Sequence, residues 1–178
     1  MNLKLLFILS VLVLLVNAEH LSQGIPYGYK IENVSEKDNT KIIEMIPKNE
    51  KIDNWTEKIK TTIIYNNIEE SPVEFYSLIA SQWEKICKSS KSLLLKTGKQ
   101  SGYDFALWMV TCPQKLSLSE AEFSWYKAIK GHNSFYFTQK SWRIEPTNQE
   151  VLYWTQYLSK LNVHNKKEHK NNHSSSIK

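Results

Sequence analysis

Along most of the chain, apolar and polar residues alternate, which is the pattern of β-strands that bury one face. Between residues 55 and 65, Trp55, Ile59 and Ile63 lie at even spacing while Lys58 and Lys60 occupy the other face. Similar patterns predict strands at 29–34, 40–46, 91–96, 103–112, 120–130 and 134–144. The strand at 103–112 carries apolar groups on both faces, so we expect it to be central and covered on each side.

Two other segments follow the helical period, and each begins with a capping signal. Ser71 is the expected N-cap of the first helix, with Pro72 at the first helical position and Glu74 closing a capping box. The helix should run to about Cys87, and its buried stripe should consist of Phe75, Leu78, Ile79, Gln82 or Trp83, and Ile86.

The second helix starts with the capping box of Thr147 and Glu150, and its buried stripe should consist of Val151, Trp154, Leu158 and Leu161. Between the two helices, Gly131-His132-Asn133 marks a short hairpin. This order of elements predicts an α+β domain: a mainly antiparallel sheet of about six or seven strands, with two amphipathic helices packed on it.

The first residues have the pattern of a secretory signal peptide. Lys4 precedes an apolar run at 5–16, and Val16-Asn17-Ala18 forms a small-residue cleavage site before Glu19. A spanning helix needs about 20 apolar residues, so this run is short for a permanent anchor, which is the alternative interpretation. We expect an exported protein, periplasmic or extracellular, with no stable membrane anchor after cleavage.

The remaining chain is expected to form one domain at 40–163, with a loop-rich segment at 19–39 ahead of it. Residues 164–178 lack an apolar period and are rich in Lys, Asn, His and Ser, so we expect a disordered tail. The tail contains three histidines, His164, His169 and His173, and we interpret them as part of a solvated segment. The alternatives are that they loosely bind a transition metal or that the basic tail is attracted to an anionic surface.

The charge of the chain does not indicate a nucleic-acid-binding protein. The formal net charge is +5, and setting aside Lys4 and the net +3 of residues 164–178 leaves the domain near +1. Arg143 is the single arginine, whereas clamping of phosphate groups favours arginine. Nucleic acid is therefore not an expected partner.

Cys87 and Cys112 are the two cysteines of the chain, and export would place them where disulfides persist. We expect them to be bonded, since a catalytic thiol would need a reducing compartment and a nearby base. If Cys87 ends the first helix, the bond would hold that helix against the face of the 103–112 strand that carries Ala106, Trp108 and Val110.

Three sequence segments resemble the PsbP-like superfamily of exported α/β/α sandwiches. They are Ile43-Glu44-Met45-Ile46-Pro47, Asn54-Trp55-Thr56-Glu57, and Lys127-Ala128-Ile129-Lys130-Gly131 at the hairpin. The resemblance covers residues 40–161 and implies a binding or assembly factor without a shared catalytic residue set. It transfers no active site, cofactor or metal, because no residue here matches the ligand positions of the photosynthetic members.

The hairpin is the candidate contact site of the chain, because loops concentrate function. His132 lies in it, with Lys127, Tyr136 and Arg143 on the adjoining strands. The nucleophile-elbow, zincin, P-loop and C-x-x-C motifs are absent from the sequence. We therefore expect a non-enzymatic binding protein whose partner is another protein or a cell-surface macromolecule. The alternative is a small exported enzyme that uses His132 with Tyr136 or Lys127 as acid and base.

The aromatic residues allow two interpretations. Trp125 and Trp142 lie on neighbouring predicted strands, where they form either a core layer or a binding platform on the sheet face. We favour the core.

Overall fold

The structure, a computed structural model, describes residues 19–66, 69–113 and 121–165. The expected signal peptide and residues 166–178 of the expected tail lie outside these ranges. In the described part of the chain, no helix has the length and apolarity required to cross a membrane.

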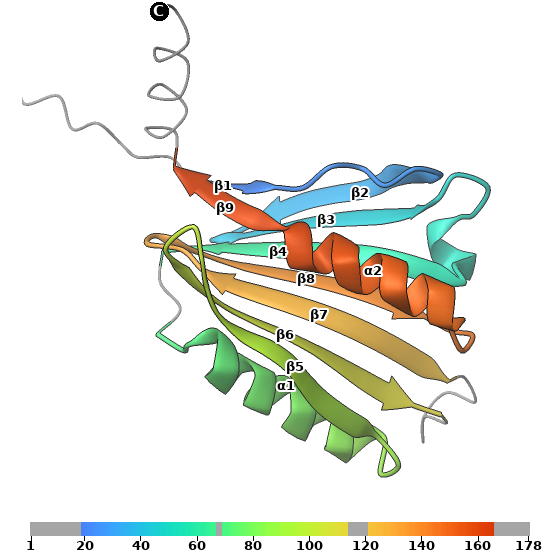
Figure 1. Cartoon of the computed structure of the whole chain (residues 1–178). Coiled ribbons are helices and arrows are strands. Elements are labelled where there is room, and N and C mark those ends of the chain that lie inside the picture. Colours follow the sequence, from blue (N-terminus) through green and yellow to red (C-terminus); the bar gives the residue numbers. More distant parts are fainter. Residues whose placement is uncertain (1–18, 67–68, 114–120, 166–178) are drawn as a thin grey trace, which may run out of the picture.

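The centre of the molecule is a seven-stranded sheet in the order β2-β3-β4-β8-β7-β6-β5 (Figure 1). Every neighbouring pair is antiparallel, which confirms the predicted sheet. Its strands are β2 (Tyr29–Lys37), β3 (Thr40–Pro47), β4 (Glu57–Tyr65), β5 (Lys91–Gln100), β6 (Tyr103–Cys112), β7 (Glu122–Lys130) and β8 (Ser134–Trp142). A short 3-10 turn, η1 (Ile52–Asn54), precedes β4.

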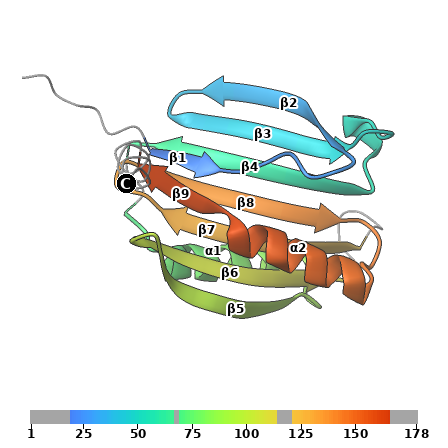
Figure 2. The ribbon, with the colours of Figure 1, turned by 45° about the horizontal axis from the view of Figure 1, so that its top comes forward.

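The two faces of the sheet carry different elements (Figures 1 and 2). Helix α1 (Pro72–Ile86) packs on β5, β6 and β7. Helix α2 (Asn148–Lys160) lies on the opposite face, together with a two-stranded ribbon of β1 (Glu19–Ser22) and β9 (Asn162–Asn165). We call these the α1 face and the α2 face.

On the α1 face, the core forms between α1 and the centre of β6 and β7. Trp83 is buried there, and its indole nitrogen donates to the Tyr126 hydroxyl at 2.8 Å. The helix residues packed on this core are Phe75, Tyr76, Ile79 and Trp83. The predicted stripe was wrong at Leu78 and Ile86, which are about half exposed. Leu78 lies on the flank of the helix, and Ile86 is its last residue.

The expected disulfide joins Cys87 to Cys112, with the Cα atoms 6.1 Å apart. Cys87 is the C-cap of α1, and Cys112 shares the α1 face with Ala106, Trp108 and Val110. The bond therefore ties the end of the helix to the end of β6, as predicted.

On the α2 face, Trp154, Leu158 and Leu161 are buried against the sheet and Val151 packs at their edge, which confirms the predicted stripe. Trp125 and Trp142 are core residues, 4% and 3% exposed, and meet edge to face with ring centroids 5.2 Å apart. The core interpretation of this pair is confirmed.

The ends of the domain differ from the expectation. The segment 19–39, expected to be loop with one short strand, contains β1 and the nine-residue β2. His164 and Asn165, placed in the tail, belong to β9 and pair with His20 and Glu19. Four-residue strands are too short to show a period, and β1 and β9 pair across almost the whole domain, so the pattern did not reveal them.

Candidate functional site

The four residues proposed around the hairpin do not form one site. His132 is exposed in the turn, and Tyr136 is buried near the start of β8. Arg143 follows the far end of β8, where its guanidinium lies 4.2 Å from the centre of the Trp55 ring. Only His132 and Tyr136 therefore share an end of the sheet, and their roles in binding stay predictions.

The amine of Lys127 is already engaged inside the protein. Its side chain is 1% exposed, and Nζ donates to the carbonyl oxygens of Ser159 (2.9 Å) and Leu161 (2.7 Å) and to Oε1 of Gln100 (2.7 Å). Burial, and secondarily the charge of Lys96, lowers the pKa of Lys127 to about 8. This lysine caps the C-terminal end of α2, so it is not an open contact residue.

A second buried lysine, Lys140, was not singled out from the sequence. It is fully buried, donates to the Tyr29 hydroxyl at 2.6 Å and is bonded to the Glu57 carboxylate. Its ammonium also lies 4.3–5.0 Å from the ring centres of Tyr29, Trp142 and Trp154. Burial lowers the pKa of Lys140 to about 8 although Glu57 opposes the shift. Through Trp154, these contacts hold the middle of α2 on the sheet.

An open cavity lies elsewhere on the α2 face, between the segment that begins with β1 and strands β2, β3 and β4. Its volume is about 310 Å³, within the range of small-molecule sites. The apolar residues that line it are Leu21, Ile25, Ile31, Ile43, Met45 and Ile63, and the polar ones are Glu19, His20, Gln23, Lys41, Thr61, Tyr65 and Tyr136. We call this the β1 cavity.

The β1 cavity has a polar end and an apolar interior. Lys41 at the start of β3 and Tyr136 at the start of β8 are both in register with Ile63 of β4, so all three belong to one row across the sheet. Met45 and Ile43 lie further along β3. A ligand lying along the strands would thus meet charge at one end and mainly aliphatic side chains further along, with Thr61 and Gln23 among them.

Lys41 is the cation available at the polar end. In the described ranges, no hydrogen bond or ion pair involves its ammonium. The nearby carboxylate of Glu19 is engaged with the hairpin, since it accepts from the backbone N–H groups of His132 (2.9 Å) and Asn133 (3.2 Å). Burial and the charge of Glu19 raise the pKa of the Tyr136 phenol to about 12, so this residue presents a neutral hydroxyl.

The hairpin glycine is required by this arrangement. A Cβ atom on Gly131 would lie 2.5 Å from Glu19 Oε2 and 2.8 Å from the backbone oxygen of Ser134. Glycine therefore lets Glu19 approach the turn and bring β1 over the sheet.

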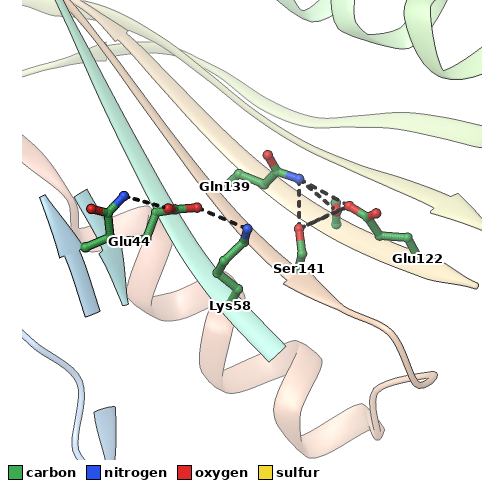
Figure 3. Close-up of polar contacts among 7 residues, drawn as sticks. Glu44, Lys58, Glu122, Gln139 and Ser141 are labelled. Carbon is green, nitrogen blue, oxygen red and sulfur yellow. Dashed lines mark hydrogen bonds and ion pairs between the residues drawn. The ribbon is translucent and has the colours of Figure 1, made fainter. Parts of the chain in front are cut away.

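On the α1 face, beside the helix, polar side chains in a row form hydrogen bonds and an ion pair with one another (Figure 3). The amide of Gln139 donates to the hydroxyls of Ser141 (2.8 Å) and Ser124 (3.2 Å), and both serines donate to Glu122. On the outer strands, Lys58 pairs with Glu44 at 3.1 Å. Because these groups are bonded to one another, this face offers fewer free polar groups than the β1 cavity.

The comparisons with known proteins bear on the fold. No family model and no curated protein sequence matches the chain. The solution structure of cyanobacterial PsbP (CyanoP) from Synechocystis sp. PCC 6803 superposes with a TM-score of 0.50 at 6% identity, covering 84% of this chain and 94% of CyanoP. The fold is PsbP-like.

A second solved structure, LpqN of Mycobacterium tuberculosis, which is involved in cell envelope biogenesis, is similar with a TM-score of 0.42 at 5% identity. The superposition covers 83% of this chain and 85% of the LpqN chain. The comparison confirms the PsbP-like fold that the resemblance implied. In this structure the three segments lie on β3, before β4 and at the end of β7. At these identities the likeness concerns the fold alone.

Proposed function

We propose that the chain is an exported, non-enzymatic binding protein that holds an anionic amphiphile in the β1 cavity. The observation that carries this proposal is the cavity itself. It combines a mainly aliphatic floor with Lys41 at its polar end, a lysine that has no ion-pair partner among the described residues. Export is supported by the signal-peptide pattern at 1–18, and a disulfide is typical of proteins in oxidising compartments.

The aliphatic floor favours a hydrocarbon chain as the buried part of the ligand. Ile31, 47% exposed, and Ile25, 55% exposed, are uncovered apolar groups on the cavity wall. Removing a methylene group from water contributes about 0.8 kcal/mol, so several methylenes supply most of the affinity. The hydrocarbon chain of the ligand can be part of a free lipid or of a cell-surface macromolecule, the kind of partner expected from the sequence.

The polar end favours a carboxylate or phosphate head group. Lys41 supplies a positive charge, and Tyr65 and Tyr136 line the same end of the cavity. Because Glu19 accepts hydrogen bonds from the hairpin, its carboxylate is partly neutralised by backbone dipoles. The ammonium of Lys41 would repel a cationic head group, so the site should prefer anionic amphiphiles over cationic ones.

A displacement assay with a fluorescent fatty acid tests this function. We expect laurate to compete, and Lys41→Gln to weaken laurate binding by up to about fivefold while leaving dodecanol binding unchanged, as for the loss of one partly exposed ion pair. Lys60→Gln is the matched control, since Lys60 lies on β4 with its side chain on the α1 face opposite Glu44. It should change neither affinity.

Ile63→Ala separates the hydrocarbon from the head group. It removes part of the cavity floor and should weaken laurate and dodecanol alike. His132→Asn should leave both unaffected, because this side chain does not line the cavity. If neither laurate nor dodecanol displaces the probe at millimolar concentration, the cavity is not a ligand site and the proposal fails.

A further inference from the structure

The β1–β9 ribbon brings two histidines side by side. His20 of β1 and His164 of β9 are direct partners in the antiparallel register, flanked by the pairs Glu19 with Asn165 and Leu21 with Val163. Leu21 and Val163 pack against the core of the α2 face, and Val163 is fully buried. Since side chains alternate along a strand, the histidine pair lies on the other side of the ribbon from Leu21 and Val163.

Neither imidazole has another structural task in the described part of the chain. His20 is exposed and His164 is half-buried, and no hydrogen bond or ion pair involves either ring. The two rings contact each other: their centroids are 5.8 Å apart and their planes are tilted by 32°. The ring nitrogens are therefore free to accept a ligand.

We propose that His20 and His164 together bind one divalent transition-metal ion, of the class of Zn²⁺, Ni²⁺ or Cu²⁺, with water completing the coordination. Imidazole is a preferred ligand for these ions. Two imidazoles on one ion, with metal–nitrogen distances of about 2.0–2.1 Å, place their ring centroids roughly 4.5 Å apart at a right angle and roughly 5.2 Å apart at the tetrahedral angle. The observed 5.8 Å is close enough for small side-chain rotations to bring both nitrogens onto one ion.

The site is a two-residue chelate held by backbone pairing. Among the described residues, no group of three or more histidine, cysteine or acidic side chains is arranged to hold a metal. Because the strand pairing already fixes both Cα positions, binding orders only the two side chains. The ion would bridge the first and last strands of the described chain, so it should stabilise the ribbon and the mouth of the β1 cavity, which His20 also lines.

The test is a Zn²⁺ titration of residues 19–178 by calorimetry, with two extra residues, Gly-Ser, ahead of Glu19 to keep the terminal amine away from His20. We expect His20→Asn and His164→Asn each to weaken Zn²⁺ binding at least tenfold. His132→Asn is the matched control, an exposed histidine outside the ribbon, and should leave the affinity unchanged. Paramagnetic Ni²⁺ should broaden the imidazole NMR signals of His20 and His164 in the wild type.

The histidines at 169 and 173 provide the discriminating variant. If the ribbon is the site, His169→Asn with His173→Asn retains binding that still depends on His20 and His164. A loss smaller than tenfold in either ribbon variant, or no Zn²⁺ binding at 1 mM, overturns the proposal. Thermal melts check that the variants fold: without metal the ribbon variants should match the wild type. Saturating Zn²⁺ should raise the melting temperature of the wild type by about 5 °C and leave that of the two ribbon variants unchanged.

Discussion

At the scale of single residues, the two buried lysines show how a polar side chain can belong to a core. Lys127 and Lys140 lie on the α2 face of β7 and β8, at positions where the alternation calls for apolar groups. Lys127 satisfies the last carbonyls of α2, and Lys140 is bonded to Glu57 and surrounded by aromatic rings. A buried ammonium without such partners would be strongly destabilising, so each lysine specifies how α2 seats on the sheet.

The stability should therefore change with pH in a direction set by these lysines. The pKa of Lys127 is about 8 in the folded protein against 10.5 as the ordinary value. Between these values the unfolded chain keeps the proton that the folded protein has lost, so the free energy of unfolding rises with pH. Below pH 8 Lys127 is protonated in both states, so it no longer makes the free energy of unfolding depend on pH. Above pH 10 the unfolded tyrosines ionise before Tyr136, whose pKa is about 12, and the stability falls again.

Lys127→Met should remove the contribution of Lys127 to the rise in the free energy of unfolding, which is about 1–2 kcal/mol between pH 8 and 10. Urea unfolding at several pH values, with the disulfide intact, measures it. Lys99→Met, at an exposed position on β5, serves as the control and should keep the wild-type slope. An identical slope in Lys127→Met and wild type would mean that the amine titrates normally in the folded state.

At the scale of elements, the helices are the part of the fold that local sequence determines. Both capping boxes are present, with Glu74 bonded to Ser71 and Glu150 to Thr147. Each box spans four consecutive residues, so its partners are visible in the sequence, and both helices begin where predicted. Ser71→Ala and Thr147→Ala should each lower the free energy of unfolding by about 1 kcal/mol. Ser81→Ala, on the exposed surface of α1, should cost nothing measurable in the same denaturation series.

The strands show where prediction from sequence stops. β6 was located from residue 103 to 112 because its apolar run is long, and β4 was placed two residues early because Trp55 continues the alternation. In the structure the ring of Trp55 instead contacts the cations of Lys58 and Arg143. The β1 cavity could not be predicted, since it exists only where a distant short strand crosses β2–β4, and nothing in the local pattern of Lys41 marks it as unpaired.

At the scale of the whole molecule, the ribbon joins the two ends of the described chain, and this changes the expectation for the tail. If all of residues 164–178 were a disordered tail, their removal would leave the stability unchanged. Because Val163 is fully buried and β9 is the partner of β1, deletion of residues 162–178 should lower the melting temperature by several degrees, as for the loss of one buried valine and a strand pair.

Deletion of residues 166–178 alone is the comparison, and it should leave the melting temperature nearly unchanged, since the sequence there has no apolar period. Parallel thermal melts of the two truncated proteins and the wild type decide this. Equal melting temperatures for both truncations would show that β9 contributes nothing to the stability of the fold.

The pairing of Glu19 with Asn165 also sets an order of events when the protein is made. A chain is synthesised from its N-terminus, so β1 appears first and waits for a partner that arrives last. Pairing across nearly the whole domain closes the largest loop in the fold, which is a slow step relative to the local hairpins. The seven-stranded sheet can assemble beforehand, whereas the β1 cavity takes shape only when the last strand has arrived. Amide protons of β1 and β9 should accordingly exchange with solvent sooner than those of β6 and β7.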